Sequence, residues 1–166
     1  MNLKTLADKI KRCRLCALGR TRKKAVPGEG AAKARIMFIG EAPGKKEDET
    51  GRPFTGKAGD FFNELLKKSK INKRKCFVTS VVKCRPPKNR NPKAIEARIC
   101  VQEYLAKQIM LINPKVVVLL GNIARKYVPK ELLKRKKVII THHPAAGMRF
   151  PKSRKKMERD FRKIKS

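Results

Sequence analysis

VVVLLG, at residues 116–121, is a run of five apolar side chains that ends at a glycine. A strand that is buried on both faces of a parallel sheet has this composition, because both rows of its side chains need apolar neighbours. RIMFI at 35–39 is a second run of this kind, and CFVTSVV at 76–82 is rich in β-branched residues. Residues 138–141 predict a fourth strand.

Apolar side chains at helical spacing lie between these strands. Helices are expected over residues 3–12, 58–68, 92–113, 122–134 and 152–165. We expect the long middle helix to be capped at Asn91 and to begin at Pro92. Residues 13–34 and 41–56 are rich in glycine and proline and are expected to be irregular. Strands that alternate with helices predict a single domain, in which a parallel sheet is covered on both faces.

The chain of 166 residues carries 45 Lys and Arg against 13 Asp and Glu, which gives a net charge of +32. Such a charge favours a nucleic-acid partner, through phosphate contacts and counterion release. The alternative is a solvated, lysine-rich surface of a heat-adapted protein. No apolar stretch is long enough to span a membrane, and the N-terminus lacks the apolar region of a signal peptide. We therefore expect a cytosolic chain, whose thiols stay reduced.

Four of the five cysteines form two pairs. Cys13 and Cys16 form a C-x2-C motif, and Cys84 and Cys100 lie 16 positions apart. Four thiolates hold either a tetrahedral zinc ion or a [4Fe–4S] cluster, although the second pair lacks the close spacing of a zinc ribbon. The simpler interpretation is that Cys84 and Cys100 are ordinary buried thiols. Cys76 lies within an expected strand, which predicts a small core residue.

Three loops are expected at the carboxyl edge of the sheet, where parallel α/β folds bind their ligands. They span residues 40–56, 83–91 and 141–149, and each has an unusual composition. The second loop carries Lys83 and, around its prolines, Arg85, Lys88 and Arg90, which suits contact with phosphates. We therefore expect the three loops to build one site together.

Four residues of the first and third loops are candidates for chemistry. Glu41 follows a strand, where it is placed to position water or bind a polar ligand, although GEAPG is also a plausible tight turn. Phe54 lies among glycines and prolines, where a ring is better placed to stack on a base than to pack in a core. His142 and His143 directly follow the last strand, and this position favours a functional over a structural histidine.

A specific combination of motifs runs through nearly the whole chain. It consists of Cys13-x2-Cys16, GEAPGKKEDETGRPFTGKAG (40–59), VTSVVKCRPPKNRNP (78–92), Cys100, VVVLLG (116–121) and HPAAGMRFP (143–151). In this combination the chain closely resembles the family-4 uracil-DNA glycosylases, which are iron–sulfur enzymes of thermophilic archaea and bacteria. The resemblance begins near residue 9 and continues to the C-terminal helix.

The resemblance implies a three-layer α/β/α domain over residues 1–166, with a central four-stranded parallel sheet and an N-terminal cluster-binding segment. It implies that a [4Fe–4S] cluster is held by Cys13, Cys16, Cys84 and Cys100. It also implies a uracil pocket formed by Glu41, the backbone of Ala42, Phe54, Ser80 and His143. The cluster is expected to be structural, joining the N-terminal segment to residues 84–100.

The implied activity is that of a DNA-repair glycosylase, a hydrolase of N-glycosyl bonds. The enzyme would flip uracil out of single- or double-stranded DNA and cleave its bond to deoxyribose, leaving an abasic site. His143 would donate a hydrogen bond to uracil O2, where negative charge grows in the transition state. Glu41 would orient the attacking water or hold the pocket. We expect a monomer that acts in the cytoplasm on the nucleoid.

The chain departs from the family pattern in three places. Ser80 stands where the family usually has asparagine, whose amide matches both O4 and N3–H of uracil. One hydroxyl cannot make both contacts, which predicts weaker discrimination and a broader range of deaminated bases. The segment between Gly121 and His143 is shorter than usual, and His142 replaces an aromatic residue.

Two other functions fit part of the sequence. A noncatalytic nucleic-acid-binding protein that carries a cluster or zinc would explain the charge and the cysteines. A redox iron–sulfur protein would explain the cysteines alone. Neither explains why Glu41, Phe54 and His143 occur together in their motifs.

Overall fold

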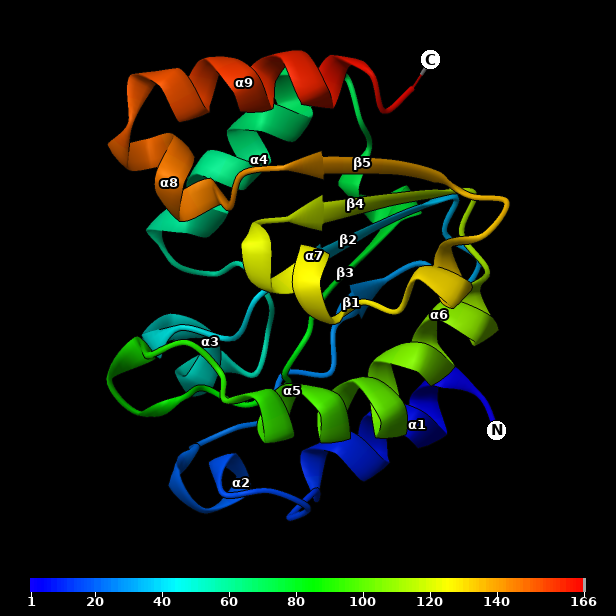
Figure 1. Cartoon of the computed structure of the whole chain (residues 1–166), viewed down its shortest axis with the longest axis vertical. Coiled ribbons are helices and arrows are strands. Elements are labelled where there is room, and N and C mark those ends of the chain that lie inside the picture. The colour runs from blue at the N-terminus through cyan, green and yellow to red at the C-terminus, as the bar shows by residue number, and fades with distance from the viewer. Residues whose placement is uncertain (166) are drawn as a thin grey trace.

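A single five-stranded sheet forms the centre of the computed structural model, which describes residues 1–165 (Figure 1). Its strands are β1 (Glu29–Gly30), β2 (Ile36–Gly40), β3 (Cys76–Ser80), β4 (Val116–Leu120) and β5 (Lys137–Thr141). The strand order is β1-β3-β2-β4-β5. The four longer strands are parallel and confirm the predicted sheet, while β1 adds a short antiparallel edge beside β3.

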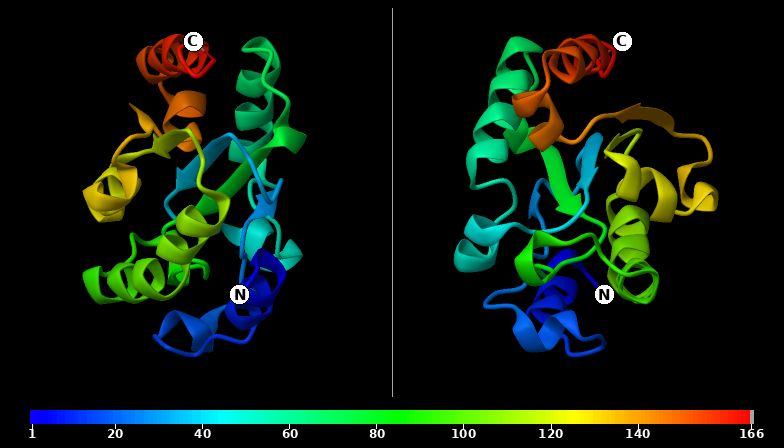
Figure 2. Two further views of the ribbon diagram at one scale, coloured as in Figure 1. Left: turned by 90° about the vertical axis from the view of Figure 1, so that its right-hand side faces the viewer. Right: turned by 60° about the vertical axis from the view of Figure 1, so that its left-hand side comes forward.

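Helices cover both faces of the sheet, as the three-layer prediction requires (Figures 1 and 2). One layer contains α1 (Leu3–Lys11), α5 (Ala94–Cys100), α6 (Ala106–Ile112) and α7 (Asn122–Tyr127). The other layer contains α4 (Lys57–Lys68), α8 (Pro144–Arg149) and α9 (Pro151–Arg162). Two further short helices, α2 (Leu18–Thr21) and α3 (Lys45–Thr50), lie in the segments before β1 and after β2. A π-helical turn, Val101–Leu105, joins α5 to α6.

Alternating side chains of the strands divide the interior into two cores. Met37 and Ile39 of β2 point into the core beneath α1, α5 and α6, while Phe38 points into the core beneath α4 and α9. In the second core the ring of Phe38 meets the rings of Phe62 and Phe161 at centroid distances of 5.0 and 5.8 Å. The middle strands are buried on both faces, which explains their uninterrupted apolar runs.

Three segments expected to be irregular contain regular elements, and the first of them, residues 13–34, contains α2 and β1. Residues 41–56 contain α3, because Glu47 accepts a hydrogen bond from the backbone N–H of Gly44 and so caps the first turn. Residues 141–149 contain α8, which begins at Pro144 with His143 as its N-cap. The latter two segments are therefore more rigid than their composition indicates.

Two predicted helices have different bounds in the structure. The middle helix begins at Ala94 rather than at Pro92, because Glu96 accepts from the N–H of Lys93 and makes that residue the N-cap. The helix expected over 122–134 ends at Tyr127, since the residue before Pro129 is extended. Lys130–Leu133 then forms only a short 3-10 turn.

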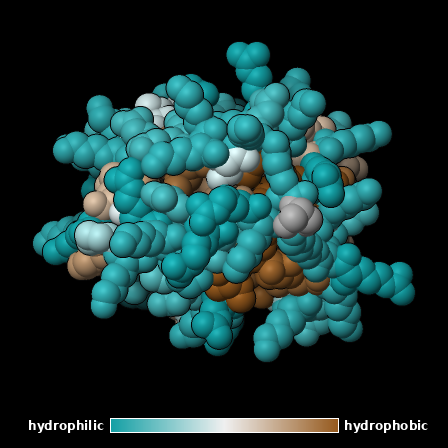
Figure 3. All heavy atoms as spheres, turned by 90° about the horizontal axis from the view of Figure 1, so that it is seen from above, coloured by the Kyte–Doolittle hydropathy of each residue, from teal (hydrophilic) through white to brown (hydrophobic). Residues whose placement is uncertain are grey.

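The outer surface is mostly hydrophilic. Seen from the end of the molecule that carries α9, polar side chains cover most of the face and apolar atoms show between them (Figure 3). No helix within residues 1–165 has the length and apolar character needed to cross a membrane.

We expect the substitution Phe161→Ala to lower the free energy of unfolding by about 3–5 kcal/mol, since the ring is fully buried between Phe38 and Phe62. Denaturant unfolding measures this loss. Lys155→Ala, at an exposed position of the same helix, is the control and should change stability by less than about 0.5 kcal/mol. Equal effects of the two changes would show that α9 is not part of the core.

Candidate functional site

A pocket lies at the carboxyl edge of the sheet, next to the ends of β2 and β3. Gly40 and Ser80 are register partners, so the two strands end side by side at this pocket. It is lined by Val26, Gly40, Glu41, Ala42, Pro43, Glu47, Pro53, Phe54, Ala58, Thr79, Ser80 and His143. The five residues for which the resemblance implies a base pocket, Glu41, Ala42, Phe54, Ser80 and His143, thus line one pocket.

The prediction that three loops share this site is wrong for the second one. Residues 83–91 contribute none of the residues that line the pocket within the described chain, and β3 reaches it only through Thr79 and Ser80. Cys84 instead lines a second cavity. His142 is also absent from the pocket, because its Nδ1 is 2.7 Å from the hydroxyl of Ser153 on α9.

His143 presents a hydrogen-bond donor to the pocket. Its Nδ1 accepts from the backbone N–H of Ala145 at 3.1 Å, so in the neutral ring the proton lies on Nε2. Burial lowers the pKa of the imidazole to about 4, although the charge of Glu47 opposes this shift. Gly121 adopts a φ of 97° beside this ring, a conformation that favours glycine. The ring is therefore neutral and fixed at neutral pH.

Phe54 is more closely packed than its loop position indicates. Its ring stacks on Phe62 of α4 with centroids 4.7 Å apart and lies 6.1 Å from the ring of His143. One face of Phe54 is thus covered by the core, and only the other face is left for a planar ligand. A Cβ at Gly59 would lie 1.9 Å from the carbonyl oxygen of Phe54, so glycine is required where α4 meets this loop.

Glu47 holds the loop between β2 and α4 together, and the sequence analysis missed it. Its Oε1 accepts from the N–H of Gly44, and its Oε2 accepts from the N–H groups of Thr55 and Gly56, each at 2.9 Å. One carboxylate therefore joins both ends of the segment that carries Phe54. The spacing of Gly44 and Glu47 is that of a capping box, which is the signal that could have identified it.

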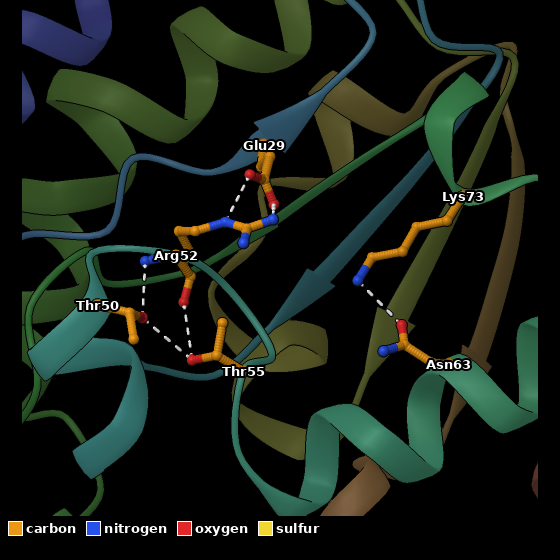
Figure 4. Close-up of polar contacts among 6 residues, drawn as sticks. All are labelled: Glu29, Thr50, Arg52, Thr55, Asn63 and Lys73. Atoms are coloured by element: carbon orange, nitrogen blue, oxygen red, sulfur yellow. Dashed lines mark hydrogen bonds and ion pairs between the residues drawn. The ribbon is translucent and has the colours of Figure 1, made fainter.

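The outer side of the same loop is tied to β1 and to itself (Figure 4). Arg52 donates two hydrogen bonds to Glu29, from Nε at 2.9 Å and from Nη2 at 3.2 Å. The hydroxyls of Thr50 and Thr55 are 3.1 Å apart. Bidentate pairs of this kind fix orientation as well as distance. The position of Phe54 is thus set by contacts on both sides of its loop.

Glu41 and Ser80 form the wall of the pocket at the ends of β2 and β3. Burial raises the pKa of the Glu41 carboxyl above its usual value. The hydroxyl of Ser80 donates to the backbone carbonyl of Val82 at 2.6 Å. The carbonyl of Glu41 accepts from the N–H of Val82 at 3.2 Å. Glu41 and Ser80 are therefore both hydrogen-bonded to the backbone of Val82.

Lys83 is a buried cation behind this wall. Its Nζ donates to the carbonyl of Ser80, the hydroxyl of Thr79 and the amide oxygen of Gln108, at 2.6–2.7 Å. Burial lowers the pKa of the ammonium to about 7, while the charges of Cys100 and Cys84 oppose this shift. The lysine connects the end of β3 to the second cavity.

All four paired cysteines line that second cavity. Cys13, Cys16, Cys84 and Cys100 line it together with the charged residues Lys83 and Glu96 and mostly apolar residues, including Ile10, Ile99 and Tyr104. Burial raises the pKa of Cys84 to about 12 and that of Cys100 to about 11. Within residues 1–165, no group of three or more His, Cys, Asp or Glu is placed to hold a metal ion. Cys76, by contrast, is a core residue, as predicted.

Two polar contacts hold the segments that carry the cysteines. The side chain of Arg90 donates to both carboxylate oxygens of Glu96, at 2.8 and 3.0 Å, and so joins the loop after Cys84 to α5. Arg22 donates to the backbone carbonyl of Cys13 at 2.9 Å. The thiols are therefore positioned by the surrounding chain.

The model of the uracil DNA glycosylase superfamily matches residues 27–165. The chain is 40% identical to the type-4 uracil-DNA glycosylase of Saccharolobus solfataricus, over 99% of this chain and 85% of that one. It is 37% identical to that of Archaeoglobus fulgidus, over 98% of this chain and 92% of the other. The type-4 enzyme of Thermotoga maritima is 40% identical over 89% of this chain and 83% of its own.

The fold is also similar to a solved structure. The solution NMR structure of a candidate uracil DNA glycosylase from Methanosarcina acetivorans superposes with a TM-score of 0.57. The match covers 87% of this chain and 99% of the other, at 14% sequence identity. At this identity the similarity concerns the fold alone.

We expect Glu47→Ala to loosen the pocket loop without unfolding the protein. The N–H groups of Gly44, Thr55 and Gly56 would lose their shared acceptor, so their hydrogen exchange should accelerate by about tenfold or more. Amide exchange followed by NMR measures this, with the β4 amides as the internal reference. Unchanged exchange at Thr55 and Gly56 would show that Arg52 and Glu29 hold the loop by themselves.

Proposed function

The chain belongs to the type-4 branch of the uracil-DNA glycosylase superfamily, and from this membership we infer that it is a DNA-repair hydrolase that removes uracil from DNA. The reaction cleaves the N-glycosidic bond and leaves an abasic site. The observation that carries this conclusion is the pocket, in which Glu41, Ala42, Phe54, Ser80 and His143 meet at the end of the sheet.

We propose that the flipped base stacks on the free face of the Phe54 ring. Its other face is covered by Phe62, which keeps the ring in one orientation. Stacking on a fixed aromatic ring stabilises a base by about 1–3 kcal/mol. Because extrusion of a base from a duplex costs a few kcal/mol, this contact offsets part of that cost.

His143 is the proposed electrophile. As the glycosidic bond breaks, negative charge develops on uracil O2, and the Nε2–H of the neutral ring would donate to it. The N–H of Ala145 holds Nδ1 and keeps the donor in place. A fixed donor of this kind typically contributes about 10²- to 10³-fold in rate. Glu41, whose carboxyl lines the same pocket, would orient the attacking water.

DNA would lie across the pocket mouth, next to α8 and α9. Arg149, Lys152 and Lys155 of this region are exposed, and the whole chain carries a charge of +32. Contacts of these side chains with phosphates need no particular base sequence. We propose that they hold single- or double-stranded DNA while the base enters the pocket. The monomeric state and the cytoplasmic location remain predictions.

We propose that the four cysteines hold a [4Fe–4S] cluster. Their thiols line one cavity, and the separation of Cys84 from Cys100 is not the close C-x2-C spacing of a zinc ribbon, which favours the cluster over zinc. When bound, the cluster would supply a covalent cross-link between the N-terminal segment and residues 84–100. Binding requires the thiolate forms, so the raised pKa values of Cys84 and Cys100 couple metal binding to the release of protons.

The function is tested by release of uracil from single- and double-stranded DNA. We expect the wild-type protein to release uracil, and His143→Ala to slow the chemical step by about 10²-fold or more while DNA binding is kept. His142→Ala should have less effect, because that ring is held at α9. A protein that binds DNA but releases no uracil would instead be the noncatalytic binding protein.

The excision rate should not show an ordinary histidine titration. Since burial lowers the pKa of His143 to about 4, the ring is already neutral above about pH 5, and its titration should cause no inflection in the rate between there and about pH 8. Below that range protonation of Nδ1 breaks the contact with Ala145 and the rate should fall. An inflection near pH 6.5 that disappears in His143→Asn would contradict this.

The cofactor is tested by the metal content of protein purified without oxygen. We expect about four irons per chain, from the stoichiometry of the cluster. Cys84→Ala should lose the iron, and Cys76→Ala, which changes a cysteine of the core, should retain it. Stoichiometric zinc in the wild-type protein, or loss of iron in Cys76→Ala alone, would refute the proposed ligands.

A further inference from the structure

We propose that Ser80 selects the base by accepting one hydrogen bond from a ring N–H, and that it offers no donor to the pocket. The pocket then admits bases that carry an N–H beside a carbonyl, such as uracil, and excludes bases whose ring nitrogen carries a lone pair, such as cytosine. This proposal rests on the proposed uracil-DNA glycosylase function and concerns how its pocket distinguishes substrates.

The hydroxyl of Ser80 already donates its proton to a hydrogen bond within the protein. Oγ donates it to the carbonyl oxygen of Val82 over 2.6 Å, and Val82 is 1% exposed. If the hydroxyl turned towards a ligand, this buried carbonyl would lose that hydrogen bond, which disfavours the turned state by about tenfold or more. The two lone pairs of Oγ remain available, so the hydroxyl acts towards the pocket as an acceptor.

The backbone of Ser80 is fixed as well. Its carbonyl accepts from the buried ammonium of Lys83 at 2.7 Å, and the residue pairs in register with Gly40 of β2. The N–H of Val82 is held by the carbonyl of Glu41. The acceptor therefore cannot shift to follow a different base.

Deamination of cytosine to uracil changes N3, the ring nitrogen that the Ser80 acceptor would face. In cytosine N3 carries a lone pair, whereas in uracil it carries a proton. With O2 at His143, N3 is the next atom along the edge of the base, and the substituent at C4 lies one atom further. Ser80 would then pair with N3–H of uracil and would face a lone pair in cytosine. A buried acceptor opposite a lone pair leaves both groups unpaired, which is a strong basis for rejection.

The test compares uracil with 2-pyrimidinone, a base that lacks both the N3 proton and the C4 oxygen. Single-turnover release of both bases is measured in the wild type and in Ser80→Ala. We expect the substitution to slow uracil release by about tenfold, because uracil loses a contact, and to leave 2-pyrimidinone release unslowed or faster, because its N3 lone pair no longer faces an acceptor. Ser69→Ala, at the far end of α4, is the control and should change neither rate.

Ser80→Asn gives an independent measurement and retains a polar side chain at this position. Its amide both accepts from N3–H and donates to O4, so the ratio of uracil to 2-pyrimidinone rates should rise above that of the wild type. Equal slowing of both bases by Ser80→Ala, or an unchanged ratio in Ser80→Asn, would overturn the proposal. A wild-type protein that releases no uracil at all would instead overturn the proposed function.

Discussion

The parallel pairing of β2 with β3 on one side and β4 on the other is the constraint on which the molecule depends. Because of this pairing, the neighbouring strands end at the same edge of the sheet, where Gly40 and Ser80 lie side by side. His143, which follows β5, lines the pocket at this edge. Since both faces of the central strands are buried, a shift of register would move apolar side chains into the wrong core. The pocket is therefore a consequence of the sheet, and its loops are held against a fixed edge.

A single buried lysine connects the two sites of the molecule. Lys83 holds the carbonyl of Ser80 at the pocket, while the next residue, Cys84, lines the cysteine cavity. The amide of Gln108 extends this network from α6 to the carbonyl of Pro27. Buried polar groups that are fully paired make a structure rigid, because each lost contact leaves an unpaired partner. The cysteine cavity and the pocket are thus parts of one rigid unit.

The sequence predicts the sheet from a local pattern, whereas the full set of pocket residues and the full set of four cysteines were implied only by the resemblance to a known family. Apolar runs identify the strands, and the cysteine pairs and the HP motif are specific. It does not predict the roles of Glu47 and Lys83, since a charged side chain usually marks a solvated surface. Only the fold shows that Glu47 accepts three backbone N–H groups and that Lys83 is 1% exposed.

The positions of the four cysteines along the chain have a consequence for synthesis. Cys13 and Cys16 leave the ribosome first, but the cavity that they line also needs Cys84 and Cys100. At translation rates of about 5–20 residues per second the first pair waits roughly 4–17 s for the last cysteine to be made. During this interval the N-terminal thiols lack the other residues of their cavity and are more open to oxidation than in the folded chain. The segment that is made first is thus among the last to reach its final place.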